Sequence, residues 1–170
     1  MELSKKDRLI LYNQYEILKH IDSEEKERYE INQKILRNGY KYDYDELIDF
    51  LDEETPIEVS KFVYDVLQMY HCINNSYYDL TEEEKKGFEK LNIKFGGFDG
   101  NEEPKYYWYA CFLLEDLGKF EESYNNGKIE INSHRNMLNK YSRMISRWEE
   151  VRGSRYDSLT LKQIKYITSF

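Results

Sequence analysis

Apolar residues along the chain recur at spacings of three and four, which predicts helices rather than strands. A first helix should begin after Ser4 and end before Asp22. Its apolar positions repeat at helical spacing and are Ile10, Leu11, Ile17, Leu18 and Ile21. A second helix follows at once, with Ile31 and Ile35 on its buried face and Gly39 as a left-handed stop. The two segments together predict an αα-hairpin.

The strongest helix start lies near the middle of the chain. Thr55, Pro56 and Glu58 supply an N-cap, a proline at the first helical position and an acid at the third. The helix that follows runs from Thr55 to Tyr78. Its apolar stripe is wide and contains Val59, Phe62, Val63, Val66, Met69, Tyr70, Ile73 and Tyr77. We expect it to be the central, most buried helix.

Shorter helices are predicted around this central one. Their expected ranges are Asp43 to Leu51, Thr81 to about Leu91, Pro104 to Gly118, Ser133 to Gly153, and Thr160 onward. Capping boxes are expected between Asp43 and Glu46 and between Thr160 and Gln163. Residues Lys128 to Asn132 form the only plausible extended segment. The pattern predicts an all-α fold: one multihelical domain over residues 1–170, with about eight helices around the long central helix.

Charge is distributed unevenly along the 170 residues. The net charge is −8, with −13 through Gly127 and +5 from Lys128 to Phe170. The acidic segment, Asp43 to Glu58, holds eight acids and no base. This balance argues against general attraction to nucleic acid or to an anionic membrane.

Segments that would direct the chain to a membrane or out of the cell are not readable in the sequence. The charge-free run Tyr106 to Leu114 is nine residues, far short of a bilayer span. The charged first residues do not fit an export signal. Cys72 and Cys111 lie in apolar surroundings and are expected to be buried, reduced thiols. We therefore expect a cytoplasmic protein with no membrane partner.

A basic stripe lies on the predicted helix from Ser133. Lys140, Arg143 and Arg147 are spaced at i, i+3 and i+7, opposite the apolar face of that helix. One interpretation is an anionic partner, including nucleic acid. The other is a solvated face, or one that meets the acidic segment within the chain or in a second copy.

An aromatic run is the second candidate for partner binding. Tyr106, Tyr107, Trp108 and Tyr109 are consecutive, so on a helix at least one of them must face outward. Such residues can stack on bases, but only Lys105 lies beside them, so core packing and a protein interface are favoured. The candidate partner-binding residues are therefore Lys140, Arg143, Arg147, Tyr106, Tyr107 and Tyr109.

Spacing patterns of known catalytic and metal sites are missing from the sequence. His71, in the central helix, is interpreted as a polar core residue bonded to a backbone or tyrosine oxygen. The loop from Gly96 to Asn101 resembles a phosphate cradle but has the wrong spacing and carries acids. We expect Asp99 or Asn101 to cap the next helix. No catalytic residue, cofactor or metal ligand is predicted.

Several short segments, taken in order, resemble the YfbU family. They are Arg8 to Tyr15, Arg37 to Tyr40, Met69 to His71, Phe95 to Asp99 followed by Tyr106 and Tyr109, and Tyr141, Met144 and Trp148 in the carboxy-terminal helix. The resemblance covers nearly the whole chain. It implies a multihelical bacterial cytoplasmic protein of uncharacterised biochemical function, with no catalytic residues to transfer.

These observations favour a non-enzymatic interaction or regulatory protein that forms a homo-oligomer or binds a protein partner. The abundance of large aromatic residues, 16% of the chain, is the main reason to expect self-association. The alternative is a nucleic-acid-linked regulatory protein that uses the basic carboxy-terminal helix. A second alternative is an enzyme with a site near His71.

Overall fold

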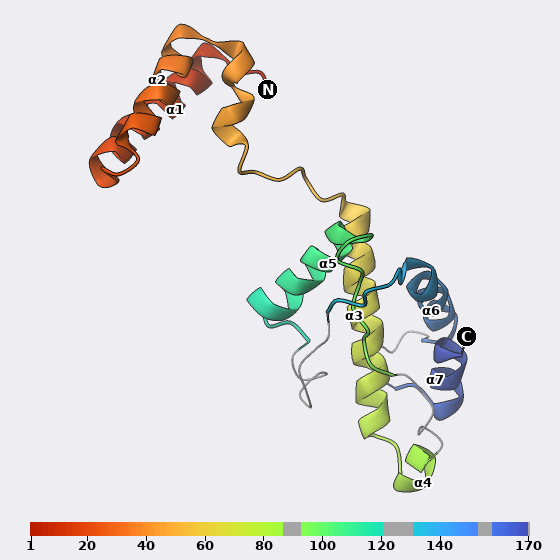
Figure 1. Cartoon of the computed structure of the whole chain (residues 1–170). Coiled ribbons are helices and arrows are strands. Elements are labelled where there is room, and N and C mark those ends of the chain that lie inside the picture. Colours follow the sequence, from red (N-terminus) through yellow and green to blue (C-terminus); the bar gives the residue numbers. More distant parts are fainter. Residues whose placement is uncertain (87–92, 121–130, 153–157, 170) are drawn as a thin grey trace. The chain divides into compact units, whose positions relative to one another are not determined.

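The chain is helical in a computed structural model that describes residues 1–86, 93–120, 131–152 and 158–169 (Figure 1). This confirms the all-α class. Its contacts group into two compact units, an N-terminal unit, Met1–Glu54, and a C-terminal unit, Thr55–Phe170. The expected single domain over residues 1–170 stays a prediction.

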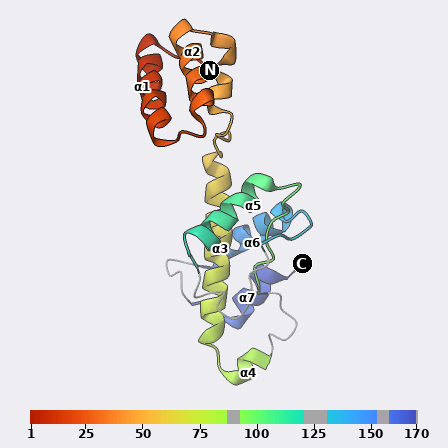
Figure 2. The same ribbon diagram turned by 60° about the vertical axis from the view of Figure 1, so that its left-hand side comes forward.

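The N-terminal unit is built on the predicted αα-hairpin. Helices α1 (Lys5–Ile21) and α2 (Lys26–Asn38) lie side by side in both ribbon views (Figures 1 and 2). Ser4 and Asp7 form a reciprocal capping box at the start of α1. Gly39 ends α2 in the left-handed conformation, with φ of 72°. These local signals therefore act as the sequence predicted.

The segment after α2 differs from its predicted form. It makes two 3-10 turns, η1 (Lys41–Asp43) and η2 (Asp45–Ile48), and neither has a side-chain cap. The expected capping box of Asp43 with Glu46 is wrong. A 3-10 turn places residues three apart on one side. That geometry lets Tyr44 and Leu47 pack together against Ile35 and Leu36.

Burial in the N-terminal unit is limited. Its buried hydrophobic residues are Ile35, Leu36, Tyr44 and Leu47, and α1 contributes none. Ile31, which was expected on the buried face of α2, is exposed. The buried side of α2 is instead formed by Leu36 together with the expected Ile35. Many large apolar side chains of this unit therefore remain at the surface.

In the C-terminal unit, α3 (Ile57–Tyr78) is the central helix, as predicted. Its expected start is wrong, because Pro56 rather than Thr55 is the N-cap and no side chain caps the helix. It buries eight residues, Val63, Val66, Leu67, Met69, Tyr70, Cys72, Ile73 and Ser76. It packs against α5 (Pro104–Cys111) and α6 (Leu138–Val151), and α7 (Leu161–Thr168) packs on α6. The short helix α4 (Glu82–Lys85) follows α3, and a π-helical turn, η4 (Phe112–Asp116), follows α5.

A β-bridge joins two loops of the C-terminal unit. Phe98 N donates to Ile131 O at 2.8 Å, and Ser133 N donates to Phe98 O at 3.0 Å. Of the predicted extended segment, residues 128–132, only 131 and 132 are described, and Asn132 forms the bridge. The predicted end of a helix near residue 91 falls outside the described ranges.

Helix α6 begins at Leu138, five residues later than Ser133. Glu103, which lies at the start of α5, caps the first turn of α6 with its side chain. Its carboxylate accepts hydrogen bonds from Met137 N at 2.7 Å and Leu138 N at 2.9 Å, and from Asp99 N at 2.9 Å. Glu103 is only 2% exposed. It thus replaces the local N-cap that α6 lacks.

Candidate functional site

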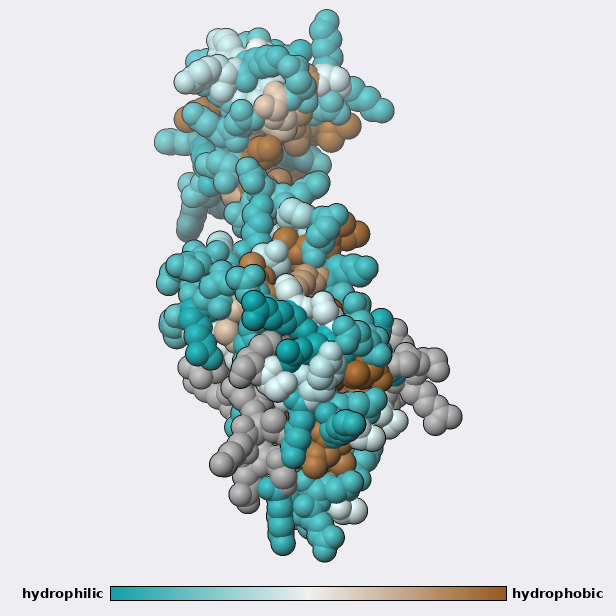
Figure 3. Space-filling model, turned by 90° about the vertical axis from the view of Figure 1, so that its right-hand side faces the viewer, coloured by the Kyte–Doolittle hydropathy of each residue, from teal (hydrophilic) through white to brown (hydrophobic). Residues whose placement is uncertain are grey.

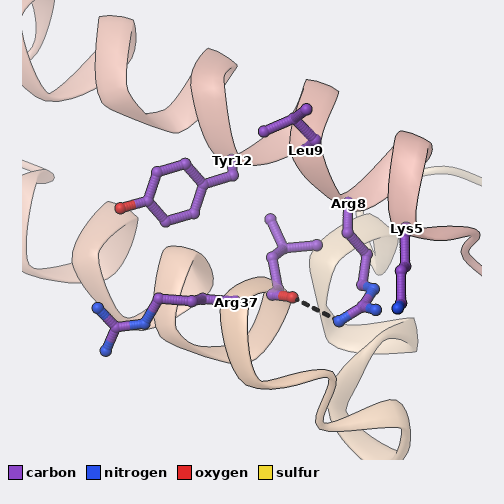
Figure 4. Close-up of a pocket in the computed structure, with 6 residues that line it drawn as sticks. Lys5, Arg8, Leu9, Tyr12 and Arg37 are labelled. Carbon is purple, nitrogen blue, oxygen red and sulfur yellow. Dashed lines mark hydrogen bonds between the residues drawn. The ribbon is translucent and has the colours of Figure 1, made fainter.

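A basic hollow opens between the two helices of the N-terminal unit (Figure 4). Its volume is about 390 Å³. Six residues line it: Lys5, Arg8, Leu9, Tyr12, Leu36 and Arg37. The hollow therefore combines three cationic side chains with an apolar and aromatic wall.

The hairpin brings these residues together. Lys5, Arg8, Leu9 and Tyr12 are spaced at i, i+3, i+4 and i+7, so they share one face of α1. The last turn of α2 supplies Leu36 and Arg37. In Figure 4, Lys5 and Arg8 lie side by side at one end, and Arg37 lies at the other end, across the gap from Tyr12. The cations thus occupy both ends of the hollow, with the apolar wall between them.

Arg8 joins the hollow to the end of α2. Its Nη1 donates to Leu36 O at 3.0 Å, which satisfies a carbonyl at the helix C-terminus. Its Nε is buried and has no hydrogen-bond partner. A Cβ on Gly39 would lie 2.8 Å from Arg8 Nη1, so glycine there also leaves room for the guanidinium. Arg8 is therefore held in place with hydrogen-bonding capacity unused.

None of the six described residues that line the hollow is an acid that could neutralise its cations. The hydrogen bond from the Ser4 hydroxyl holds the Asp7 carboxylate at the cap and lowers its pKa. Side-chain hydrogen bonds, chiefly from Lys19 and also from Gln33, lower the pKa of Glu16 as well. Within the described ranges, Lys5 and Arg37 form no ion pair. In a chain of net charge −8, positive charge is thus concentrated here.

The sequence comparisons connect this chain to known proteins. The family model described as the YfbU domain matches residues 1–169. The chain belongs to the YfbU family. The UPF0304 protein MJECS11 of Methanocaldococcus jannaschii is 38% identical over 157 residues, which cover 91% of this chain and 92% of the relative. Two of the YfbU-like segments, residues 8–15 and 37–40, contribute Arg8, Leu9, Tyr12 and Arg37 to the hollow.

The predicted basic stripe of this YfbU chain is divided among different roles. Arg147 Nη1 donates to Tyr166 O at 3.0 Å and to Ser169 O, and its guanidinium lies over the Tyr166 ring. It therefore caps the end of α7. Lys140 is half-buried. Its pKa is lowered chiefly by this burial and also by the positive charge of nearby Arg135. Arg143 alone of the three is exposed. Partner binding by this stripe stays a prediction.

The predicted aromatic run lies on α5 of the YfbU domain. Tyr106, Tyr107 and Tyr109 are half-buried against the core, and the residue that faces outward is Trp108, 66% exposed. Tyr106 contacts the Phe62 and Phe98 rings, each at 5.7 Å between centroids. The run is thus mainly core packing with one exposed indole. Its role at a protein interface stays a prediction.

His71 and the cysteines lie within the packed YfbU core. His71 is half-buried, its Nε2 is 3.0 Å from Asn75 Nδ2, and its ring contacts Phe120. Cys72 and Cys111 are buried, as predicted. Asp99 accepts hydrogen bonds from Asn101 N and Glu102 N within its own loop. The expected side-chain cap of the next helix is wrong, because α5 begins at Pro104 and its N-cap, Glu103, makes no side-chain capping bond. The residues that the structure describes include no cluster of three or more potential metal ligands.

Sequence reasoning missed both the basic hollow and Glu103. The hairpin prediction already implied that the start of α1 lies near the end of α2, and both ends carry basic residues. That juxtaposition was the available signal for the hollow. Glu103 had no comparable signal, because its partners lie in another part of the sequence. None of the helices in the described part of this YfbU domain is long and apolar enough to cross a membrane.

Proposed function

We propose that this YfbU protein is a non-enzymatic, self-associating interaction protein, and that the outer side of α1 joins two copies. The observation that supports this is an outer stripe, defined as Ile10, Ile17 and Ile21. All three are exposed, with Ile17 at 59% and Ile21 at 74%. Hydrophobic residues at the surface are visible as brown patches in Figure 3.

Helical geometry places the outer stripe on one line. At about 100° per residue, the three isoleucines fall within about 40° of one another. Arg8, Tyr15 and Lys19, which are partly buried, lie on the opposite side. The outer stripe therefore places three exposed isoleucines on the side of α1 that faces away from its partly buried residues. Burial of such side chains is the main favourable contribution to protein association.

A second copy of α1, packed antiparallel, suits both the stripe and its flanking charges. With Gln14 at the centre of such a pair, Ile10 faces Leu18 of the other copy, which is also exposed. Lys6 then approaches Asp22 and Glu24 beyond the end of the other helix. A parallel pair would instead bring two Lys6 side chains together, which is unfavourable.

Cross-linking through an introduced cysteine tests this arrangement. The Gln14→Cys variant should form an intermolecular disulfide under mild oxidation, because both native cysteines are buried and the two residues 14 meet at the centre of the pair. Lys34→Cys, on α2, is the matched exposed control and should cross-link poorly. Equal cross-linking of both variants would contradict the antiparallel pair.

Nucleic-acid binding receives less support from the geometry. In the basic carboxy-terminal helix, Arg147 caps the end of α7 and Lys140 is half-buried, so neither is fully exposed to a phosphate. This leaves Arg143 as the exposed member of that stripe. Two buried cysteine thiols suit a reducing compartment and support a cytoplasmic location.

A further inference from the structure

The basic hollow has a recognisable complement elsewhere in the N-terminal unit. Residues 49–54, here called the docking segment, are Asp49, Phe50, Leu51, Asp52, Glu53 and Glu54. Phe50 is 73% exposed and Leu51 is 60% exposed, although both are large and apolar. The segment therefore presents an apolar pair between acids. The hollow presents the inverse pattern, an apolar wall between cations.

The two patterns also match in length. Lys5 and Tyr12 are seven residues apart on α1, which corresponds to about 10 Å along the helix. Three residues of extended chain, from Asp49 to Asp52, also span about 10 Å. The docking segment contains no α-helical residues, so it can lie extended along the hollow.

We propose that the docking segment of one copy binds in the basic hollow of a second copy. Phe50 and Leu51 pack on Leu9, Tyr12 and Leu36. The acids before and after them approach Lys5 and Arg8 at one end and Arg37 at the other. Within one chain, the hollow is lined by α1 and α2 residues and not by the docking segment. The docking segment of a second copy is thus the occupant that the chain itself provides.

This inference rests on the proposed self-association and adds a second contact to it. At about 100° per residue, the centre of the hollow's face on α1 lies about 150° from the outer stripe. The two contacts therefore use different sides of α1 and can exist together. Partly exposed ion pairs contribute little affinity, so the apolar pair supplies most of the affinity while the charges fix orientation.

Peptide binding to the full chain tests the inference. The probe is a fluorescein-labelled peptide with the sequence of residues 48–56, and its anisotropy reports binding. We expect saturable binding that weakens about tenfold between about 50 mM and about 500 mM NaCl, because salt screens exposed charges. A peptide with both Phe50→Ser and Leu51→Ser keeps the charge and should not bind.

Matched variants of the full chain locate the binding site. Arg37→Gln and Lys5→Gln should each weaken peptide binding about threefold or more, whereas Arg28→Gln should not change it. Arg28 is an exposed α2 arginine that pairs with Glu25, outside the hollow. A full chain that carries Phe50→Ser and Leu51→Ser should bind the peptide more tightly, because its own docking segments no longer compete.

Several results would overturn the inference. They are absence of peptide binding, equal weakening by Arg37→Gln and Arg28→Gln, and binding of the Phe50→Ser, Leu51→Ser peptide with complete displacement by succinate, which marks a small-anion site. If the protein self-associates through Ile17 but does not bind the peptide, only this inference fails. If the peptide binds and the wild-type chain is monomeric, the proposed self-association fails, and docking between copies fails with it.

Discussion

The carboxylate of Glu103 connects separate parts of the C-terminal unit through single hydrogen bonds. It lies at the start of α5, and it accepts hydrogen bonds from backbone amides of the Asp99 loop and of the start of α6. Hydrogen bonds to an ionised acceptor are stronger than neutral ones, and a buried amide without a partner is costly. Glu103 therefore positions α6 against the core.

Removing this carboxylate should destabilise the protein strongly. We expect Glu103→Ala to lower the free energy of unfolding by about 3 kcal/mol or more, because three amides lose their acceptor. Glu103→Gln, which retains one acceptor oxygen, should cost less. Glu102→Ala changes an exposed neighbour and is the control. Urea unfolding measures these values, and equal midpoints for Glu103→Ala and the wild type would refute the role.

Gly97 is required by the β-bridge between the two loops. Its φ is +78°, and a Cβ there would lie 1.9 Å from Ile131 O. Gly97→Ala should therefore lower stability by about 2 kcal/mol or more. Gly96→Ala is a matched control, since its nearest contact would be an ordinary 3.5 Å to Met137 Cε. Thermal unfolding compares the two, and similar melting temperatures would show that the loop adjusts freely.

At the scale of elements, the capping box at the start of α1 makes stability depend on pH. Hydrogen bonding from Ser4 lowers the pKa of Asp7 in the folded state. A lowered pKa stabilises the fold above the unfolded-state value of about 3.9, and this contribution is lost as pH falls through the folded-state pKa. Asp7→Asn should thus be less stable than the wild type at about pH 6. The difference should shrink on acidification, and a pH-independent difference would contradict this sign.

Some helix starts made by neighbouring residues could be predicted from the sequence. The side-chain caps at Ser4, Thr81 and Thr160 form, whereas those expected at Asp43 and Thr55 do not. The start of α6 could not be predicted, because its cap, Glu103, lies 34 residues before Met137. Local spacing contains no information about such a partner.

The candidate site was harder to predict than the fold. Periodicity correctly indicated a helix at α1, but α1 has apolar residues on more than one side. Which side faces α2 depends on how the hairpin packs. That rotation exposes Ile17 and Ile21 and turns Arg8 and Tyr12 toward the hollow. The site therefore follows from packing that the one-dimensional pattern does not specify.

At the scale of the whole molecule, the N-terminal unit exposes large apolar residues around a small core. Four hydrophobic residues are buried there, and the C-terminal unit contains a much larger buried cluster. A small unit of this kind gains stability from association, since burial of apolar surface is the principal favourable term. Contacts between copies are the account's central claim.

Sedimentation velocity at micromolar concentration tests that claim most directly, with the wild type, Ile17→Glu and Ile57→Glu at about 50 mM and about 500 mM NaCl. Ile57 is an exposed isoleucine at the start of α3, so Ile57→Glu is the matched control. We predict an oligomer for the wild type and Ile57→Glu in both salts, smaller at high salt where charged contacts weaken, and a shift toward monomer for Ile17→Glu. A monomeric wild type in both salts, or an Ile17→Glu variant that sediments like the wild type, would contradict the account.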